Sequence, residues 1–124
     1  MRVSRREAQA IITAELRKLS AELDDRTQFK SGPNVAARSH EWWIKYDDHE
    51  SATTDRNKAL LRAYMAIGGE RLWAIGLPLS DKERVYMDRS VMRRLEKGGF
   101  VEWRDGKTEP YFLVTPAGQT FISD

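Results

Sequence analysis

Apolar residues recur every three or four positions near the amino terminus, with charged residues between them. This spacing predicts an amphipathic helix over residues 4–23. Ser4 and Glu7 have the spacing of a capping box, which would start the helix. The apolar positions are Ala8, Ile11, Ile12, Leu16, Leu19 and Leu23. We expect residues 1–50 to form an N-terminal helical extension, which either pairs with its twin in a homodimer or packs back onto its own domain.

The pattern weakens in the next part of the chain. Residues 24–34 are polar and rich in turn-forming residues, with Gly32-Pro33 as the strongest break, so they predict a loop. Residues 35–46 contain Trp42 and Trp43 but follow neither the helical nor the strand period. We interpret them as a short helix. Residues 47–55 are acidic and polar.

Helical spacing returns in the second half, which we take as a separate domain over residues 51–124. Thr54 or Asp55 can cap a helix that carries Leu60, Leu61, Tyr64 and Met65 on one side, and Gly68-Gly69 should end it. A brief helical segment is expected over residues 70–75, closed by Gly76 and Pro78.

A second capping box, Ser80 with Glu83, predicts that the next helix spans residues 81–97 and ends at Gly98-Gly99. On a helical wheel, Val85, Val91, Met92 and Leu95 gather on one side, with Met87 at its margin. The opposite side is cationic and hydroxylated, and no carboxylate lies among its members. These are Tyr86, Arg89, Ser90, Arg93, Arg94 and Lys97.

The rest of the chain alternates as strands do. Residues 101–104 predict a half-buried strand, Asp105-Gly106 a turn, and residues 111–115 a return strand that Pro116 ends. The predicted fold class is therefore mainly α with a small β-hairpin, that is, α+β.

Composition is that of an ordinary globular protein: 124 residues, 40% hydrophobic, 32% charged, with a net charge of +2. Cysteine is absent, which excludes disulfides, thiol nucleophiles and cysteine-ligated zinc. The longest apolar stretch, residues 72–79, is far shorter than the roughly 20 residues of a membrane helix. No apolar run follows the basic residues at the amino terminus, so we expect no secretory signal and no membrane partner, and a cytoplasmic location.

Arg93-Arg94-Leu95-Glu96-Lys97-Gly98-Gly99-Phe100-Val101, followed by a charged turn and Leu113-Val114-Thr115-Pro116-Ala117-Gly118, resembles the second half of winged-helix regulators of the MarR and PadR type. The resemblance covers about 40 residues, or about 65 with the two preceding helices. It implies a winged helix-turn-helix after the N-terminal helical segment. It also implies that the cationic side is a recognition-helix surface and that Arg104 and Lys107 are contacts of a wing over residues 102–110.

This sequence departs from the family pattern at three places. Asp88 falls on the apolar side of the predicted helix, where those families have a hydrophobic residue. The wing carries Glu102, Asp105 and Glu109 beside its cations. Gly118 is followed by six residues, too few for the long closing helix of the MarR type.

Two functional hypotheses follow. In the first, the protein binds double-stranded DNA sequence-specifically as a transcriptional regulator: Arg89 and Arg93, one helical turn apart, reach base edges in the major groove, while Arg94 and Lys97 contact phosphates. In the second, the same scaffold is a protein-interaction module, an adaptor or a phage-type inhibitor, that does not bind DNA. The simplest alternative to both is a solvated helix surface.

Other candidate sites are weaker. Trp42, Trp43 and Trp73 could line a pocket but are more typical of a core. His40 and His49, with acidic neighbours Glu41, Asp47, Asp48 and Glu50, match no metal-binding motif. The sequence contains no nucleophile elbow, phosphate loop or zinc-protease motif, so we expect neither an enzyme nor a cofactor.

Overall fold

The computed structural model describes residues 2–27 and 52–123. This part of the chain is a mixed α+β structure, as the sequence predicts. Its elements are α1 (Arg5–Thr27), α3 (Asp55–Gly68), β1 (Arg71–Trp73), β2 (Leu77–Pro78), β3 (Arg84–Val85), α4 (Arg89–Lys97), β4 (Val101–Arg104), β5 (Tyr111–Val114) and α5 (Pro116–Ser123). Helix α1 continues through residues 24–27, which the polar pattern had assigned to a loop. The helix predicted over residues 35–46 lies outside the described residues.

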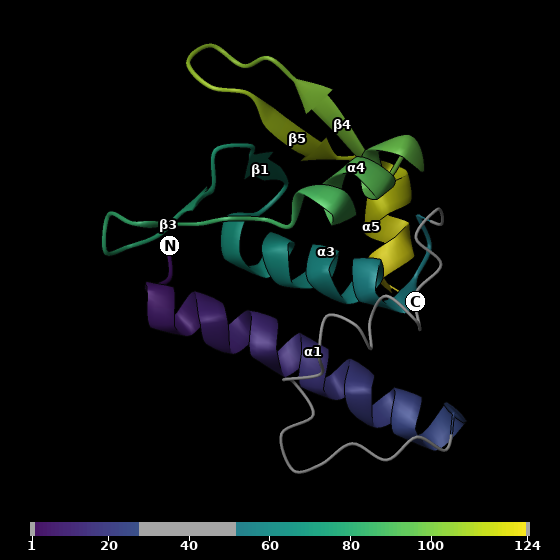
Figure 1. Ribbon diagram of the computed structural model, residues 1–124. Coiled ribbons are helices and arrows are strands. Elements are labelled where there is room, and N and C mark those ends of the chain that lie inside the picture. The colour runs from purple at the N-terminus through teal and green to yellow at the C-terminus, as the bar shows by residue number, and fades with distance from the viewer. Residues whose placement is uncertain (1, 28–51, 124) are drawn as a thin grey trace.

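Helix α3 is the centre of the fold. Figure 1 shows α1 running along one side of α3, while α4, α5 and the strands lie on the other side. The core is built where these elements meet, and its largest completely enclosed aliphatic side chains include Leu61 of α3, Leu72 of β1 and Leu95 of α4. Burying a side chain of this size contributes roughly 1.5–3 kcal/mol. The site described below therefore stands on a packed base.

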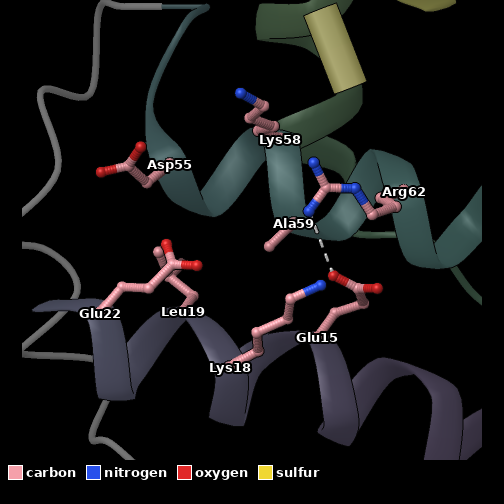
Figure 2. A pocket seen from close by; sticks show the side chains of 8 residues that line it. All are labelled: Glu15, Lys18, Leu19, Glu22, Asp55, Lys58, Ala59 and Arg62. Carbon is pink, nitrogen blue, oxygen red and sulfur yellow. Dashed lines mark hydrogen bonds and ion pairs between the residues drawn. The ribbon is translucent and has the colours of Figure 1, made fainter. Parts of the chain in front are cut away.

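The apolar residues of α1 pack against α3 of the same chain. Ala8 and Leu19 are buried, so the alternative in which this helix folds back onto its own domain is the one observed. Figure 2 shows the seam between the two helices, where Glu15 pairs with Arg62 at 3.4 Å. Arg62 also donates to the carbonyl of Ile122 near the end of α5, at 2.7 and 3.2 Å. One arginine thus joins α1, α3 and the C-terminal segment.

Three strands form an antiparallel sheet in the order β1-β5-β4. Val101 pairs with Val114 and Trp103 with Phe112, so these four residues share one side of the sheet. The helical segment predicted over residues 70–75 is wrong, because Arg71–Trp73 is strand β1, paired with β5. This pairing gives Leu72 a completely buried position that an isolated helical turn would not supply.

The helix predicted from Asp81 is wrong in its first eight residues, since α4 begins at Arg89. Residues 77–85 instead form a small hairpin, in which Leu77 pairs with Val85. The turn places Lys82 at a φ of 64°, and the Leu79 N–H donates to the Glu83 carbonyl at 2.9 Å. Burial of Leu77 and Leu79 favours this extended path over local capping.

The two ends of the supposed capping box are used by the amino terminus. The Ser80 N–H donates to the Val3 carbonyl at 2.7 Å, and the Glu83 carboxylate accepts from Arg5 Nε at 2.6 Å. The Arg5 N–H donates to Asp81 at 3.0 Å and holds the pKa of that carboxyl below its ordinary value. The hairpin therefore serves as the dock for the start of α1.

The Thr-Pro-Ala-Gly run begins helix α5, a short helix that follows the return strand. The Thr115 hydroxyl accepts from the Gly118 N–H at 3.1 Å and donates to the Gly99 carbonyl at 2.7 Å. Pro116 occupies the first helical position, where no N–H is needed. A Cβ at Gly118 would collide with the Phe100 carbonyl, so this close approach requires glycine.

Candidate nucleic-acid interface

Helix α4 begins at a cap that the sequence pattern had placed inside the helix. The Asp88 carboxylate accepts from the N–H groups of Ser90 and Val91, at 2.9 and 3.1 Å. Its negative charge also interacts favourably with the amino end of the helix dipole. The departure at Asp88 is thereby explained: this residue is the N-cap of a shorter helix, and it occupies no core position.

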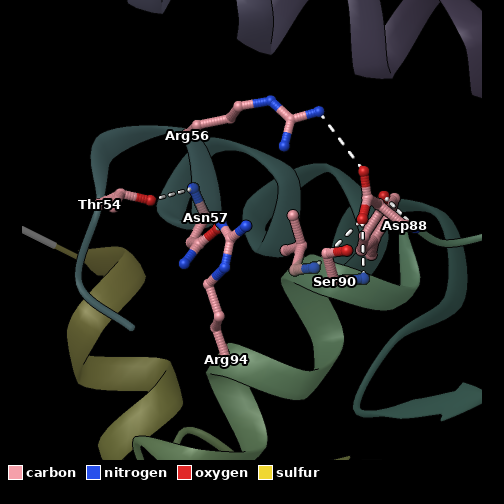
Figure 3. A network of polar contacts seen from close by, with 8 residues as sticks. Thr54, Arg56, Asn57, Asp88, Ser90 and Arg94 are labelled. Carbon is pink, nitrogen blue, oxygen red and sulfur yellow. Dashed lines mark hydrogen bonds and ion pairs between the residues drawn. The ribbon is translucent and has the colours of Figure 1, made fainter. Parts of the chain in front are cut away.

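The flank of α4 that faces α3 is fixed by a polar network, shown in Figure 3. Asn57 is completely buried, and its side-chain oxygen accepts from Arg94 at 3.5 Å. The Asn57 side-chain amide also donates to the Ala52 carbonyl at 3.3 Å. The backbone N–H of Asn57 donates to the Thr54 hydroxyl at 3.1 Å. Arg94, predicted to contact phosphate, is therefore engaged within the protein.

A second branch of the network holds the Asp88 cap. Arg56 pairs with the Asp88 carboxylate at 3.5 Å, and the Tyr64 hydroxyl accepts from the Asp88 N–H at 3.0 Å. Burial raises the pKa of the Tyr64 phenol above its ordinary value, because the charged form would be poorly solvated there. Both side chains come from α3, so α3 determines where α4 starts.

The other flank of α4 is exposed and cationic. Arg89, Arg93 and Lys97 are exposed, and within residues 2–27 and 52–123 no hydrogen bond or ion pair engages their side chains. Ser90 is exposed as well, although its N–H is used by the cap. The structure thus divides the six predicted recognition residues into engaged and available groups.

Tyr86 does not belong to α4. It lies between β3 and the helix, and 78% of its surface is exposed. Placing it on the recognition helix was an error that followed from the misplaced helix start. Its exposure keeps it available for contact with a partner.

The β4–β5 hairpin carries fewer available cations than its sequence suggests. Arg104 pairs with Glu102 at 3.0 Å, both side chains being about half exposed. Glu109 pairs with Arg84 of β3 at 3.2 Å, which removes one of the wing's three carboxylates from open solvent. Lys107 is exposed in the connection between the strands. The predicted wing contact at Lys107 is therefore available, whereas Arg104 is partly neutralised.

An open groove lies between α4 and the hairpin, with a volume of about 390 Å³. Sequence reasoning missed it, because it depends on the register that sets Trp103 opposite Phe112. Arg89 and Arg93 lie on its helical side. The complete lining is Ala74, Met87, Arg89, Met92, Arg93, Glu96, Trp103 and Phe112. The signal available in the sequence was an apolar residue at alternate positions of both strands.

Other kinds of site have less support. Among the described residues, no group of three histidine or acidic side chains could hold a metal ion. His40, His49 and their acidic neighbours lie outside the described residues, as do Trp42 and Trp43. Trp73 is partly buried and packs edge-to-face on Tyr111 at 5.3 Å, which makes it a packing residue. In the same part of the chain, no helix has the length and apolar character needed to cross a bilayer.

No protein-family model matches the chain, and no similar protein was found among curated proteins or solved structures. The resemblance to MarR- and PadR-type regulators therefore stays a prediction.

Proposed function

We propose that residues 52–123 form a winged-helix domain that binds double-stranded DNA sequence-specifically and regulates transcription. The order of α3, β1, α4, β4 and β5, together with the sheet order β1-β5-β4, supports the assignment to such a domain. The β2–β3 hairpin takes the place of its usual second helix. We assign the DNA contacts to α4 and the β4–β5 hairpin, because these would correspond to the recognition helix and the wing of a winged-helix domain.

The observation that carries this proposal is the exposed cationic flank of α4. Arg89 and Arg93 are one turn apart and can donate to guanine O6 and N7, while Lys97 can contact phosphate. Lys107 supplies a further phosphate contact from the wing. Arg94 is not assigned a DNA contact, because it already serves Asn57.

Fluorescence anisotropy with a labelled library of random duplexes tests the proposal. Binding should weaken steeply as salt rises, with a slope of log K against log salt of about −0.9 for each phosphate contacted. Arg89→Ala and Arg93→Ala should each lower the affinity for the tightest-binding duplex of the library by about tenfold. Each should also relax the sequence preference of the protein. Lys97→Ala should lower the affinity for all duplexes by a similar factor.

Arg17→Ala is the matched control, because Arg17 is an exposed arginine on α1. Its affinity for duplex should equal that of the parent protein. Absence of binding at about 50 mM salt would overturn the proposal. Equal losses in the Arg17 and Arg93 variants would reduce it to non-specific charge attraction. Light scattering of the same mixtures gives the number of chains per duplex and tests the homodimer prediction.

A further inference from the structure

The groove between α4 and the β4–β5 hairpin exposes apolar surface at an unusual place. Trp103 lies on the same side of the sheet as the buried Val101, yet 45% of its surface is exposed. In Figure 1 the β4–β5 hairpin extends beyond α4, so no helix within residues 2–27 and 52–123 covers its outer half. The sheet thus continues its apolar side past the end of the core. Exposed tryptophan of this kind is typical of contact surfaces.

The apolar side chains of the groove pack on one another and against the core. Trp103 packs edge-to-face on Phe112, with ring centroids 5.2 Å apart, and its indole N–H donates to Asp105 at 3.3 Å. Met92 at the base is 3% exposed, and Met87 packs against the core. A ligand would therefore meet a largely preformed surface and would lose little free energy in ordering it.

The charged residues of the groove are separated along α4. Arg89 and Arg93 line it along the first half of the helix, and Glu96 lines it about one turn after Arg93. Two arginines beside an apolar surface favour a ligand that presents carboxylates next to an apolar side chain. The single carboxylate at the other end disfavours a continuous polyanion along the whole groove.

From this arrangement we infer that the groove binds a short acidic segment of a partner protein, with an apolar side chain against Trp103 and Met92 and carboxylates paired with Arg89 and Arg93. A volume of about 390 Å³ is suited to a few side chains and is too small for a folded domain. A DNA duplex offers no apolar group larger than the thymine methyl in its major groove, because its bases are stacked on one another. A peptide supplies both parts of the required chemistry.

This inference also gives the partner a role, which rests on the proposed function. Arg89 and Arg93 cannot bind carboxylates and DNA at the same time. The acidic segment would therefore compete with the operator and act as an antagonist of DNA binding. Peptide binding itself does not depend on whether the protein binds DNA, so the two can fail separately.

Selection of short random peptides displayed on phage, against the full chain, tests the inference. The selected peptides should share acidic residues beside an aromatic or aliphatic residue. A fluorescein-labelled copy of the best peptide should bind the parent protein, and Trp103→Ala or Arg93→Glu should weaken it by about tenfold or more. Trp103→Phe should restore most of the affinity, because an aromatic ring is retained.

Arg17→Glu makes the same charge change as Arg93→Glu at an exposed position on α1, and it should alter peptide affinity by less than about twofold. Circular dichroism of each variant verifies that it is folded. In the NMR spectrum, the indole N–H signal of Trp103 is identified as the one missing in Trp103→Phe. This signal should shift when the peptide is added. A selection that yields no binder, or peptides without acidic residues, would overturn the inference.

The remaining outcomes are also decisive. Unchanged peptide affinity in Trp103→Ala would place the site elsewhere. If oligo-dT displaces the labelled peptide more readily than unlabelled peptide does, the natural occupant of the groove is a single-stranded nucleic acid. If the Trp103→Ala variant has a lower molecular mass in solution than the parent protein, the occupant of the groove is a second copy of the chain. If a duplex binds the protein but fails to displace the peptide, the antagonist role is wrong while the peptide site stands.

Discussion

The two flanks of α4 have similar residues but different surroundings. On the flank toward α3, Arg94 contacts the buried Asn57, and Arg56 contacts the Asp88 cap. On the flank toward the hairpin, Arg89 and Arg93 line an open groove. In sequence, all the cations of this helix belong to one polar side. In the structure, Arg94 contacts α3, whereas Arg89 and Arg93 are exposed beside the groove.

Because the two flanks differ in their contacts, we expect one flank to affect the stability of the protein and the other to affect its ligand affinity. Substitutions on the α3 flank should lower the free energy of unfolding and affect ligands only through the fold. Those on the groove flank should change ligand affinity and leave the free energy of unfolding nearly unchanged. Each of the following predictions tests one side of this comparison, in order of decreasing effect on stability.

Asn57→Ala should have the largest effect of the polar substitutions. Asn57 is completely buried, and its loss leaves the Ala52 carbonyl and the Arg94 guanidinium without this amide partner. A buried polar group that loses its partner costs about 1–3 kcal/mol, so we expect about 2 kcal/mol less stability in urea denaturation. Asn57→Asp retains an acceptor for Arg94 and separates the two contacts. A loss below about 0.5 kcal/mol in Asn57→Ala would mean that this flank is not held by the network.

Asp88→Ala should cost about 1 kcal/mol, because the first turn of α4 loses its N-cap. Asp88→Asn retains a side-chain oxygen that can accept from the Ser90 and Val91 N–H groups. This variant should therefore lose only about a few tenths of a kcal/mol of stability. Thermal unfolding of the three proteins measures the difference. Equal losses in both variants would assign the effect to the negative charge beside Arg56 in place of the cap.

The Asp88 cap also shows why the sequence predicted part of α4 and not its start. The buried spacing of Val91, Met92 and Leu95 is local to the helix, and the structure confirms it. Ser80 and Glu83 have an equally good local capping pattern, but Ser80 bonds to Val3 and Glu83 to Arg5, both distant in sequence. A capping box describes only what neighbouring residues can do, so tertiary contacts decided between the two starts.

The candidate site divides in the same way. The exposure of Arg89, Arg93 and Lys97 follows from helical periodicity, which is readable from the sequence. The engagement of Arg94 and the groove around Trp103 require the positions of α3 and β5, which periodicity does not provide. Strand register in particular turns Trp103 toward α4, and the six-residue connection that sets this register is longer than an Asp-Gly hairpin turn implies.

Tyr64→Phe should lower stability by about 1 kcal/mol near neutral pH, because the Asp88 N–H loses its acceptor. The pH dependence provides a sharper test. Since the folded-state pKa of Tyr64 is raised, its neutral form contributes stability that is fully present below the ordinary value of 10.0 and is lost as pH rises through the folded pKa. The parent protein should therefore lose stability faster than Tyr64→Phe above pH 10.0, and the gap between them should narrow.

A constant gap between the two proteins across the alkaline range would contradict burial of the phenol as the cause of this effect. Tyr86→Phe is the matched control, because Tyr86 is 78% exposed and its substitution should leave the alkaline profile unchanged. Urea denaturation at several alkaline pH values gives the free energies of unfolding for all three proteins.

Arg93→Ala should have the smallest effect on stability, within about 0.5 kcal/mol of the parent protein, because Arg93 is exposed on a helix and alanine favours helix formation. Arg94→Ala, one residue away, should cost about 1 kcal/mol through its contact with Asn57. The pair is informative because charge, helix and sequence neighbourhood are almost the same. If both variants unfold at the same urea concentration, the two flanks of α4 do not differ as their contacts indicate, and Arg94 would rejoin Arg93 as a candidate ligand contact. If only Arg94→Ala is destabilised while only Arg93→Ala loses ligand, the division of the helix into a structural and a binding flank holds at single-residue resolution.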